Sequence, residues 1–125
     1  MEVIDTNIFI DHFRGYAPAT AFFESLKGDA IFSAITETEI LTGNQCAIAE
    51  KRRDTLQFMA KLRKINVDNP IALLAGDLSR EYGKYGLELG DAIIAATAII
   101  HKAELLTKNI RDFEKIKELK VSKPY

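Results

Sequence analysis

Short apolar, β-branched runs alternate with longer helix-forming segments along all 125 residues of the chain. The runs predict β-strands at residues 2–5, 30–33, 65–67, 104–107 and 119–121. Strands that alternate with helices pair in parallel, because each connection must cross back over the sheet. The pattern therefore predicts one α/β domain over residues 1–125, with a parallel sheet of about five strands between two layers of helices.

The segments between these runs carry helix signals of several kinds. Residues 91–102 are apolar nearly all round, which is typical of a buried helix, and a loop is expected at residues 86–90 before them. Asn69-Pro70 begins another helix, since proline suits a first helical turn. Further helices are expected from Thr6 or Asn7 to about Arg14, from Pro18, from Ser33 or Thr36 past Leu41, over residues 47–64, and briefly within residues 109–117.

Composition places the chain among soluble globular proteins, with 47% hydrophobic and 28% charged residues. The single cysteine, Cys46, has no internal disulfide partner, so a reducing compartment is expected. No signal peptide is recognisable, and the most apolar stretch, residues 92–100, is too short to span a bilayer. We expect a cytoplasmic protein that does not associate with membranes.

The net charge is −1, but the charges are segregated along the chain. Residues 1–50 hold two basic and eight acidic side chains, whereas residues 51–64 hold six basic and one acidic. A basic rim around an acidic pocket would suit a polyanionic substrate. Ordinary solvated helix faces are the simpler interpretation of the basic runs taken alone.

Four acids occupy similar positions near strand-to-helix junctions. Asp5 ends the first strand, Glu39 lies in the helix after the second strand, and Asp112 follows the fourth. Such junctions lie at one edge of a parallel sheet, so these three acids can meet there. Asp91 can join them only if its buried helix starts at the same edge, which the sequence does not settle.

Helix capping is the alternative explanation for each acid. Asp5 can cap the helix that follows it, and Thr36 with Glu39 fits a capping box. Asp91 after Gly90 fits an N-cap, and Asp112 could cap the short helix that it precedes. Any one acid is better explained as a cap, but four acids at four junctions weaken that explanation.

Clustered carboxylates stay ionised only beside a cation, and oxygen ligands without His or Cys favour Mg²⁺ or Mn²⁺. Such a site can activate water and stabilise an in-line displacement at phosphorus. The chain has no glycine-rich phosphate loop and no nucleophile elbow. His12 and His101 lack the spacing of zinc ligands and are expected to lie on the surface or to have their hydrogen bonds satisfied within the fold.

Four blocks of sequence together resemble the PIN-domain family in order and spacing, over essentially the whole chain. They are Asp5-Thr6-Asn7, Ser33 to Thr36 with Glu39 to Leu41 and Gly43, Asp91 to Ala98, and Leu106 to Asn109 with Asp112-Phe113. The size of the chain is similar to that of the VapC-like toxins, a branch of this family found in toxin–antitoxin pairs.

The resemblance implies an endoribonuclease that hydrolyses RNA phosphodiester bonds with Mg²⁺ or Mn²⁺, on a flavodoxin-like sheet of order 3-2-1-4-5. Its acidic cluster, both catalytic and metal-binding, would be Asp5, Glu39, Asp91 and Asp112. Thr6 or Asn7 would orient the Asp5 carboxylate or a bound water. Thr36 and Asn109 would be polar groups that support these acids.

The same resemblance implies partners. The substrate would be tRNA, rRNA or mRNA, and a cognate antitoxin would lay a helix in an apolar groove and point a basic residue at the acids. A homodimer is usual in the family. Candidate RNA-binding residues, chosen by charge and expected nearness to the pocket, are Arg14, Lys51, Arg52, Arg53, Lys84 and Lys108.

Two alternatives remain. A PIN-like domain could bind RNA or a protein without cutting, although a binding module has no use for an uncompensated acidic pocket. A phosphoacceptor receiver domain also places an acid after its first strand. That class needs a second acid beside it, which Asp5 lacks.

Overall fold

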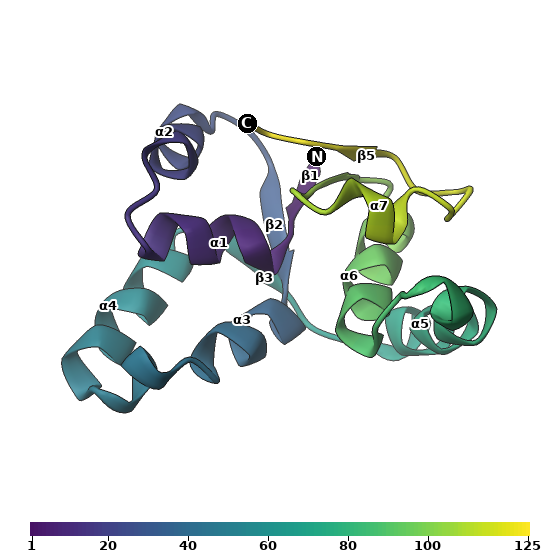
Figure 1. Cartoon of the computed structure of the whole chain (residues 1–125), viewed down its shortest axis with the longest axis horizontal. Helices are drawn as coiled ribbons and strands as arrows, with labels where there is room; N and C mark the ends of the chain where they lie inside the picture. Colours follow the sequence, from purple (N-terminus) through teal and green to yellow (C-terminus); the bar gives the residue numbers. More distant parts are fainter.

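The computed structural model describes all 125 residues and contains a five-stranded, fully parallel sheet between helices (Figure 1). The sheet has the order β3-β2-β1-β4-β5, so the predicted fold class and strand order are confirmed. Its strands are β1 (Glu2–Ile4), β2 (Ala30–Ser33), β3 (Arg63–Ile65), β4 (Glu104–Leu106) and β5 (Val121–Ser122).

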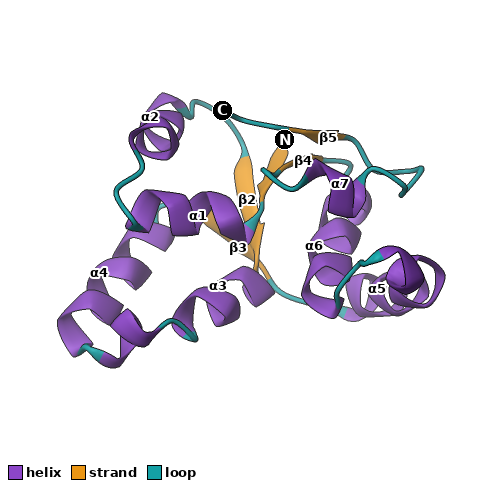
Figure 2. Cartoon of the chain, viewed as in Figure 1, coloured by secondary structure: helices purple, strands orange, loops and turns teal.

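Helices cover both faces of this sheet. Figure 2 shows the sheet nearly edge-on, with α1 to α4 on the left and α5 to α7 on the right. None of the helices has the length and apolar character needed to cross a membrane. They are α1 (Thr6–Phe13), α2 (Ala17–Ser25), α3 (Ala34–Leu41), α4 (Ala49–Met59), α5 (Asn69–Tyr82), α6 (Leu89–Ile100) and α7 (Ile110–Phe113), with 3₁₀ turns η1 (Asn44–Ala47) and η2 (Gly83–Tyr85).

Two apolar cores form because successive side chains of a strand point to opposite faces of the sheet. Val3 and Leu105 pack with the helices α5 and α6 in the larger core. Ile4 and Phe32 pack with α1 in the smaller one. The α6 helix is buried, as its apolar sequence predicts, and its run of alanines lets it pack closely on the strands.

The order of the strands places the ends of β1 and β4 side by side at the centre of the sheet. Ile4 pairs with Leu106 in the parallel register. The residues that follow them, Asp5 and Thr107, therefore leave the sheet together, at the point where the chain connections diverge to opposite faces. Open α/β sheets place ligands at such a point.

Several predicted boundaries were wrong by a few residues. The third strand is Arg63–Ile65 rather than 65–67, because Ile65 is the buried residue that pairs with Ser33, whereas Val67 is exposed. The helix predicted over 47–64 ends at Met59, since the chain must turn before it can enter β3. The last strand is Val121–Ser122 rather than 119–121.

The predicted helix caps also need correction. The α3 helix starts at Ala34 with Ser33 as its cap, so the capping box of Thr36 and Glu39 does not form. The α6 helix starts at Leu89, within the predicted loop, and Asp91 lies in its first turn instead of capping it. Asp112 lies inside α7, which begins after Asn109. Three of the four acids are therefore not caps.

Candidate active site

The carboxylate of Asp5 is held in one orientation at the end of β1. The Thr107 hydroxyl donates a hydrogen bond to its Oδ2 at 2.6 Å, and the Thr6 backbone N–H donates to its Oδ1 at 2.8 Å. Asp5 thus caps α1, as one of the alternatives predicted, in place of Thr6 or Asn7. Asp5 and Thr107 are both buried. The cap fixes the carboxylate beside the end of β4.

A second pair of threonines holds Glu39. The Thr6 hydroxyl donates to Glu39 Oε1 at 2.6 Å and lies 2.9 Å from the hydroxyl of Thr36, which is fully buried. Residues of α1 and α3 are therefore joined directly at the edge of the sheet. The Thr6 hydroxyl contacts Glu39 directly, whereas the Thr36 hydroxyl reaches Glu39 only through Thr6.

The first turn of α6 approaches the same point. A Cβ atom placed on Gly90 would lie 2.8 Å from Glu39 Oε2, closer than real Cβ contacts allow. Only glycine lets α6 pass this close to the carboxylate. Asp91 follows Gly90, so α6 does start at the edge where Asp5 and Glu39 lie, which the sequence had left open.

The electrostatics show that the four acids share one region. Burial, together with the negative charges of Asp5 and Asp112, raises the pKa of Asp91 to about 7. Burial also raises the pKa of Asp5. The hydrogen bonds from Thr107 and Thr6 oppose this rise, while the charges of Glu39 and Asp112 add to it. None of the four ion pairs in the structure involves these acids, so their charge is uncompensated.

The donor set fits a hard divalent cation better than any other group. All the available ligand atoms are carboxylate or hydroxyl oxygens, which Mg²⁺ and Mn²⁺ prefer. No three acidic, histidine or cysteine side chains are gathered closely enough to hold one ion directly. Mg²⁺ commonly binds one or two carboxylates and keeps several waters, so an open arrangement of this kind suits it.

Thr107 is the functional residue that the sequence reasoning missed. Besides donating to Asp5, its hydroxyl accepts hydrogen bonds from the Asn109 backbone N–H at 3.0 Å and from the Asn7 amide at 3.4 Å. The two asparagines thus reach Asp5 through Thr107. A signal was available, because Thr107 is a polar residue directly after a buried strand, as Asp5 is after Ile4.

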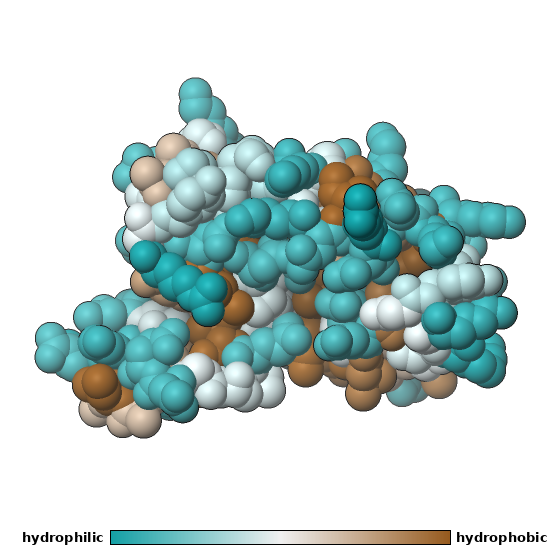
Figure 3. Space-filling model, in the orientation of Figure 1, coloured by the Kyte–Doolittle hydropathy of each residue, from teal (hydrophilic) through white to brown (hydrophobic).

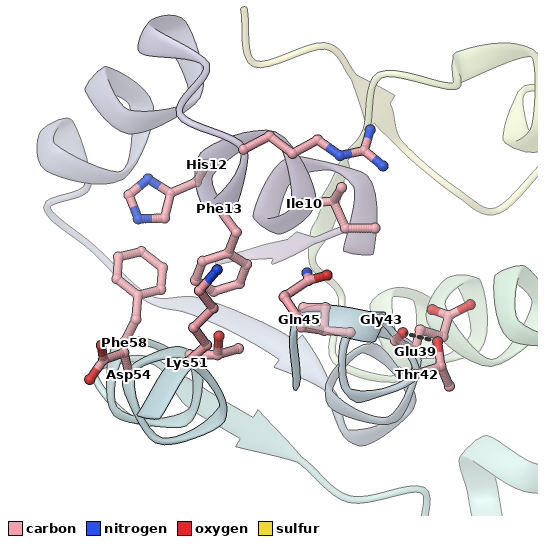
Figure 4. Close-up of a pocket in the computed structure, with 13 residues that line it drawn as sticks. Ile10, His12, Phe13, Glu39, Thr42, Gly43, Gln45, Lys51, Asp54 and Phe58 are labelled. Atoms are coloured by element: carbon pink, nitrogen blue, oxygen red, sulfur yellow. Dashed lines mark hydrogen bonds between the residues drawn. The ribbon is translucent and has the colours of Figure 1, made fainter. Parts of the chain in front are cut away.

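A groove extends from Glu39 between α1 and α4. It is an open cavity of about 710 Å³, with Phe13 of α1 facing Phe58 of α4 and Ile10 farther along α1, above Gln45 (Figure 4). Arg14 and Lys51 also line it. The space-filling view shows hydrophobic side chains at the bottom of a hollow in this region (Figure 3). The groove therefore has apolar side chains on its floor and polar and charged residues around them, with Glu39 at one end and Asp54 at the other (Figure 4).

The other basic candidates lie outside this groove. Arg52 and Arg53 do not line it, and Arg53 forms an exposed ion pair with Asp54 at 3.7 Å. Lys84 lies over the ring of Tyr85, with its Nζ atom 5.3 Å from the ring centroid. Lys108 binds Asp11 and has its backbone N–H 3.5 Å from the side-chain oxygen of Asn7.

Two residues near the acid cluster have partners of their own. The Glu37 carboxylate faces away from the cluster and pairs with Lys64 at 3.3 Å. His12 is a structural histidine, since its ring stacks on Phe58 with centroids 4.2 Å apart and its Nδ1 lies 2.9 Å from the Thr20 hydroxyl.

Comparisons with known proteins agree with this geometry. The family model described as PIN domain matches residues 3–119. Ribonuclease VapC19 of Mycobacterium tuberculosis is 34% identical over 125 residues, which cover 95% of this chain and 97% of the relative. Ribonuclease VapC1 of Methanocaldococcus jannaschii is 35% identical over 120 residues, which cover 93% and 81%.

Solved structures include a chain of a toxin-antitoxin complex from Klebsiella pneumoniae that is 34% identical, with a TM-score of 0.83. The match covers 100% of this chain and 98% of that chain. The family model, the relatives and the fold all confirm the resemblance seen in the four sequence blocks. The chain belongs to the PIN-domain family.

Proposed function

We propose that the protein is a Mg²⁺- or Mn²⁺-dependent endoribonuclease and the toxin of a toxin–antitoxin pair. The observation that carries this proposal is the convergence of Asp5, Glu39, Asp91 and Asp112 at one edge of the sheet, without any basic partner. The relatives named Ribonuclease VapC and the neighbour in a toxin-antitoxin complex support the same function.

The proposed roles follow from what each side chain contacts. Asp5, Glu39, Asp91 and Asp112 would surround the metal, one or two of them as direct ligands and the others through its waters. The metal would supply positive charge at the scissile phosphate and activate water. Thr107 and the Thr6 backbone fix the Asp5 carboxylate, while the Thr6 hydroxyl fixes Glu39. Fixed carboxylates need no reorganisation when the reaction develops charge, which is the usual origin of electrostatic catalysis.

The partners are part of the proposal. The groove between α1 and α4 has the apolar interior and terminal acid that an antitoxin helix with a basic residue would fit. The substrate would be tRNA, rRNA or mRNA. The protein would act on it in the cytoplasm. Exposed Leu73 and Leu89, 68% and 66% accessible, offer apolar contacts for a homodimer.

Cleavage of total RNA with Mn²⁺ or Mg²⁺ tests the function. Asp5→Asn and Asp91→Asn should each abolish cleavage, because each removes a charge from the acid cluster. The matched control is Glu37→Gln, which removes a nearby acid that faces Lys64 and should cut like the wild type. Unchanged cleavage in both aspartate variants would remove the proposed site. RNA binding without fragments in the wild type would favour the non-cleaving PIN-like module.

A further inference from the structure

A second cavity lies at the far end of α1 from Asp5. It has a volume of about 400 Å³ and is lined by Asp11, Arg14, Gly15, Tyr16 and Lys108. The Lys108 ammonium group donates to Asp11 Oδ2 at 2.7 Å, and the Tyr125 hydroxyl donates to the same oxygen at 2.8 Å. We call this surface the α1 rim. Its residues come from α1, from the loop after it, and from the residue that follows Thr107.

The α1 rim presents an aromatic ring that is fixed but not buried. Lys108 Nζ lies 5.2 Å from the ring centroid of Tyr16 and 5.7 Å from that of Tyr125. The two tyrosine rings are 5.9 Å apart and tilted by 53°. These contacts restrain the ring of Tyr16, yet the residue remains 48% exposed. A restrained, exposed ring is a platform on which a flat group can stack at little entropic cost.

The charge of the rim is positive. Asp11 pairs with Lys108, and the charge of Arg14 also acts on Asp11, but Arg14 takes part in none of the four ion pairs, so two cations face one carboxylate. Burial tends to raise the pKa of Asp11, but the hydrogen bonds from Lys108 and Tyr125 lower it by more. This carboxylate therefore stays charged at neutral pH. Burial and the bond to Asp11 raise the pKa of Tyr125, which keeps its hydroxyl a donor. The arrangement therefore persists at physiological pH with one free cation, Arg14.

The rim is connected directly to the acid cluster. Lys108 follows Thr107, whose hydroxyl binds Asp5, and its backbone N–H is 3.5 Å from the Asn7 side chain. Five residues separate Thr6 from Asp11, a rise of about 7.5 Å along the helix. Arg14 lines both this cavity and the groove that contains Glu39. A nucleic-acid strand lying on the acids thus has the rim beside it.

We propose that the α1 rim binds an unpaired nucleotide of the RNA adjoining the scissile phosphate, with its base stacked on Tyr16 and its phosphate bound by Arg14. This inference rests on the proposed ribonuclease function and adds a preference for single-stranded RNA at that position. A base within a duplex is already stacked, so its face is not available to Tyr16. Stacking on tyrosine tolerates any base, so the rim sets strandedness without setting sequence.

Binding of RNA in an Asp91→Asn background, which separates binding from cleavage, tests the stacking. The probe is a fluorescein-labelled 12-nucleotide RNA of random sequence, followed by anisotropy, single-stranded or annealed to a complementary pool. Tyr16→Leu should weaken single-strand binding about 5- to 150-fold, the usual effect of losing one base–aromatic stack. Tyr16→Phe keeps the ring and should bind single-stranded RNA with the affinity of the parent protein. The affinity for the duplex should not change in either variant.

The charge contribution is tested by salt dependence. Arg14→Gln should reduce the slope of log K against log salt by about 0.7, the value for one phosphate contact on a single strand. Lys27→Gln is the matched control, since Lys27 is also exposed but precedes β2 at the opposite end of the strands. Its slope should equal that of the parent.

Equal single-strand affinities for Tyr16→Leu and Tyr16→Phe would overturn the inference, and so would a parent protein that does not bind the RNA. A polyglutamate peptide that binds in a Tyr16-dependent way and displaces the RNA would show a protein-binding surface instead and would also overturn it. Because binding is measured without cleavage, a rim that binds RNA in a protein that never cuts would refute the proposed function alone.

Discussion

At the scale of single residues, the site depends on hydroxyl groups as much as on carboxylates. Thr107 and Thr6 each donate a hydrogen bond of 2.6 Å to one of the acids. Charge-assisted bonds of this length are among the strong ones in proteins. They fix where Asp5 and Glu39 point before any substrate binds.

Thr107→Val keeps the shape of the side chain and removes the bond to Asp5. We expect RNA cleavage to fall about 10- to 100-fold, the usual effect of losing a group that orients a metal ligand. Unfolding free energy should fall by about 1–3 kcal/mol, because the Asn109 N–H loses its acceptor. Thr107→Ser should restore both quantities.

Thr97→Val is the matched control, since the buried Thr97 hydroxyl donates only to the Ile93 carbonyl within α6. It should leave the cleavage rate unchanged. Full activity in Thr107→Val would contradict the orienting role of Thr107.

Gly90→Ala changes the site without removing any functional group. The new methyl group would overlap Glu39 Oε2 and push the carboxylate away from the Thr6 hydroxyl. We expect a loss of RNA cleavage of at least about tenfold, comparable to disturbing other groups around a metal. The melting temperature should not fall, because alanine is a better helix former than glycine and the flexible Glu39 side chain can move.

Gly76→Ala in α5, where a Cβ meets nothing within 4 Å, controls for the helix effect. This variant should gain up to about 1 kcal/mol in stability and cut RNA normally. If Gly90→Ala behaved in the same way, the close packing of α6 on Glu39 would have no role in catalysis.

Candidate residues could be found from sequence where their chemistry is unusual in its context. A carboxylate stands out when it ends an apolar strand, as Asp5 does, or lies near a strand-to-helix junction, as the other three acids do, so the four acids could be proposed from sequence. A threonine after a strand does not, because threonine is common in strands, and Thr107 was missed. Which of six basic residues lie near the acids depends on side-chain direction and on partners such as Asp11, which the sequence does not specify.

At the scale of elements, the start of α6 determines the electrostatics of the site. Its first turn carries Asp91 into a position where burial raises the pKa to about 7, above the ordinary 3.8. Between these values the folded, metal-free protein holds a proton that the unfolded chain releases. Its unfolding free energy should therefore fall as the pH rises from about 4 to about 7.

Urea unfolding in EDTA at several pH values measures this dependence. Asp91→Asn should flatten it and raise the stability near pH 7 by on the order of 1–3 kcal/mol. A shallower slope should remain, because burial also raises the pKa of Asp5. An equally steep loss of stability in Asp91→Asn would show that Asp91 is not the group responsible.

Element types were predictable from sequence, whereas several element ends were not. Helical periodicity identified α5 and α6, and β-branched runs identified β1 and β2. The end of α4 could not be found, because Lys61 and Leu62 are good helix formers and only the entry into β3 forces the chain to turn. The predicted start of α6 was wrong because glycine is a poor helix former and Gly90 was assigned to the loop before the helix. In the structure Gly90 lies within the first turn of α6 and permits its close approach to Glu39.

At the scale of the whole molecule, the acid cluster joins segments from both sides of the sheet. Asp5 and Glu39 belong to the side of α1 and α3, whereas Asp91 and Asp112 belong to α6 and α7. The order of the strands, which the family resemblance implied, is what brings them together. A cation bound among them would stabilise the folded protein by neutralising charge that the fold itself concentrates.

Mn²⁺ should therefore raise the melting temperature at neutral pH. At about 100 times its Kd the ion adds about 2.7 kcal/mol to the unfolding free energy of a protein that binds it only when folded. Differential scanning fluorimetry with and without EDTA measures the shift. Asp5→Asn should lose most of it and Glu37→Gln should keep it, whereas equal shifts in both variants would place the ion elsewhere.

The role of the acid cluster as a catalytic metal site is tested most directly by the rate of RNA cleavage as a function of Mn²⁺ concentration, in the wild type beside Asp91→Asn. We expect no cleavage in EDTA, a saturable rise with Mn²⁺ in the wild type, and no rise in Asp91→Asn. Cleavage in EDTA, or the same saturable rise in both proteins, would contradict it.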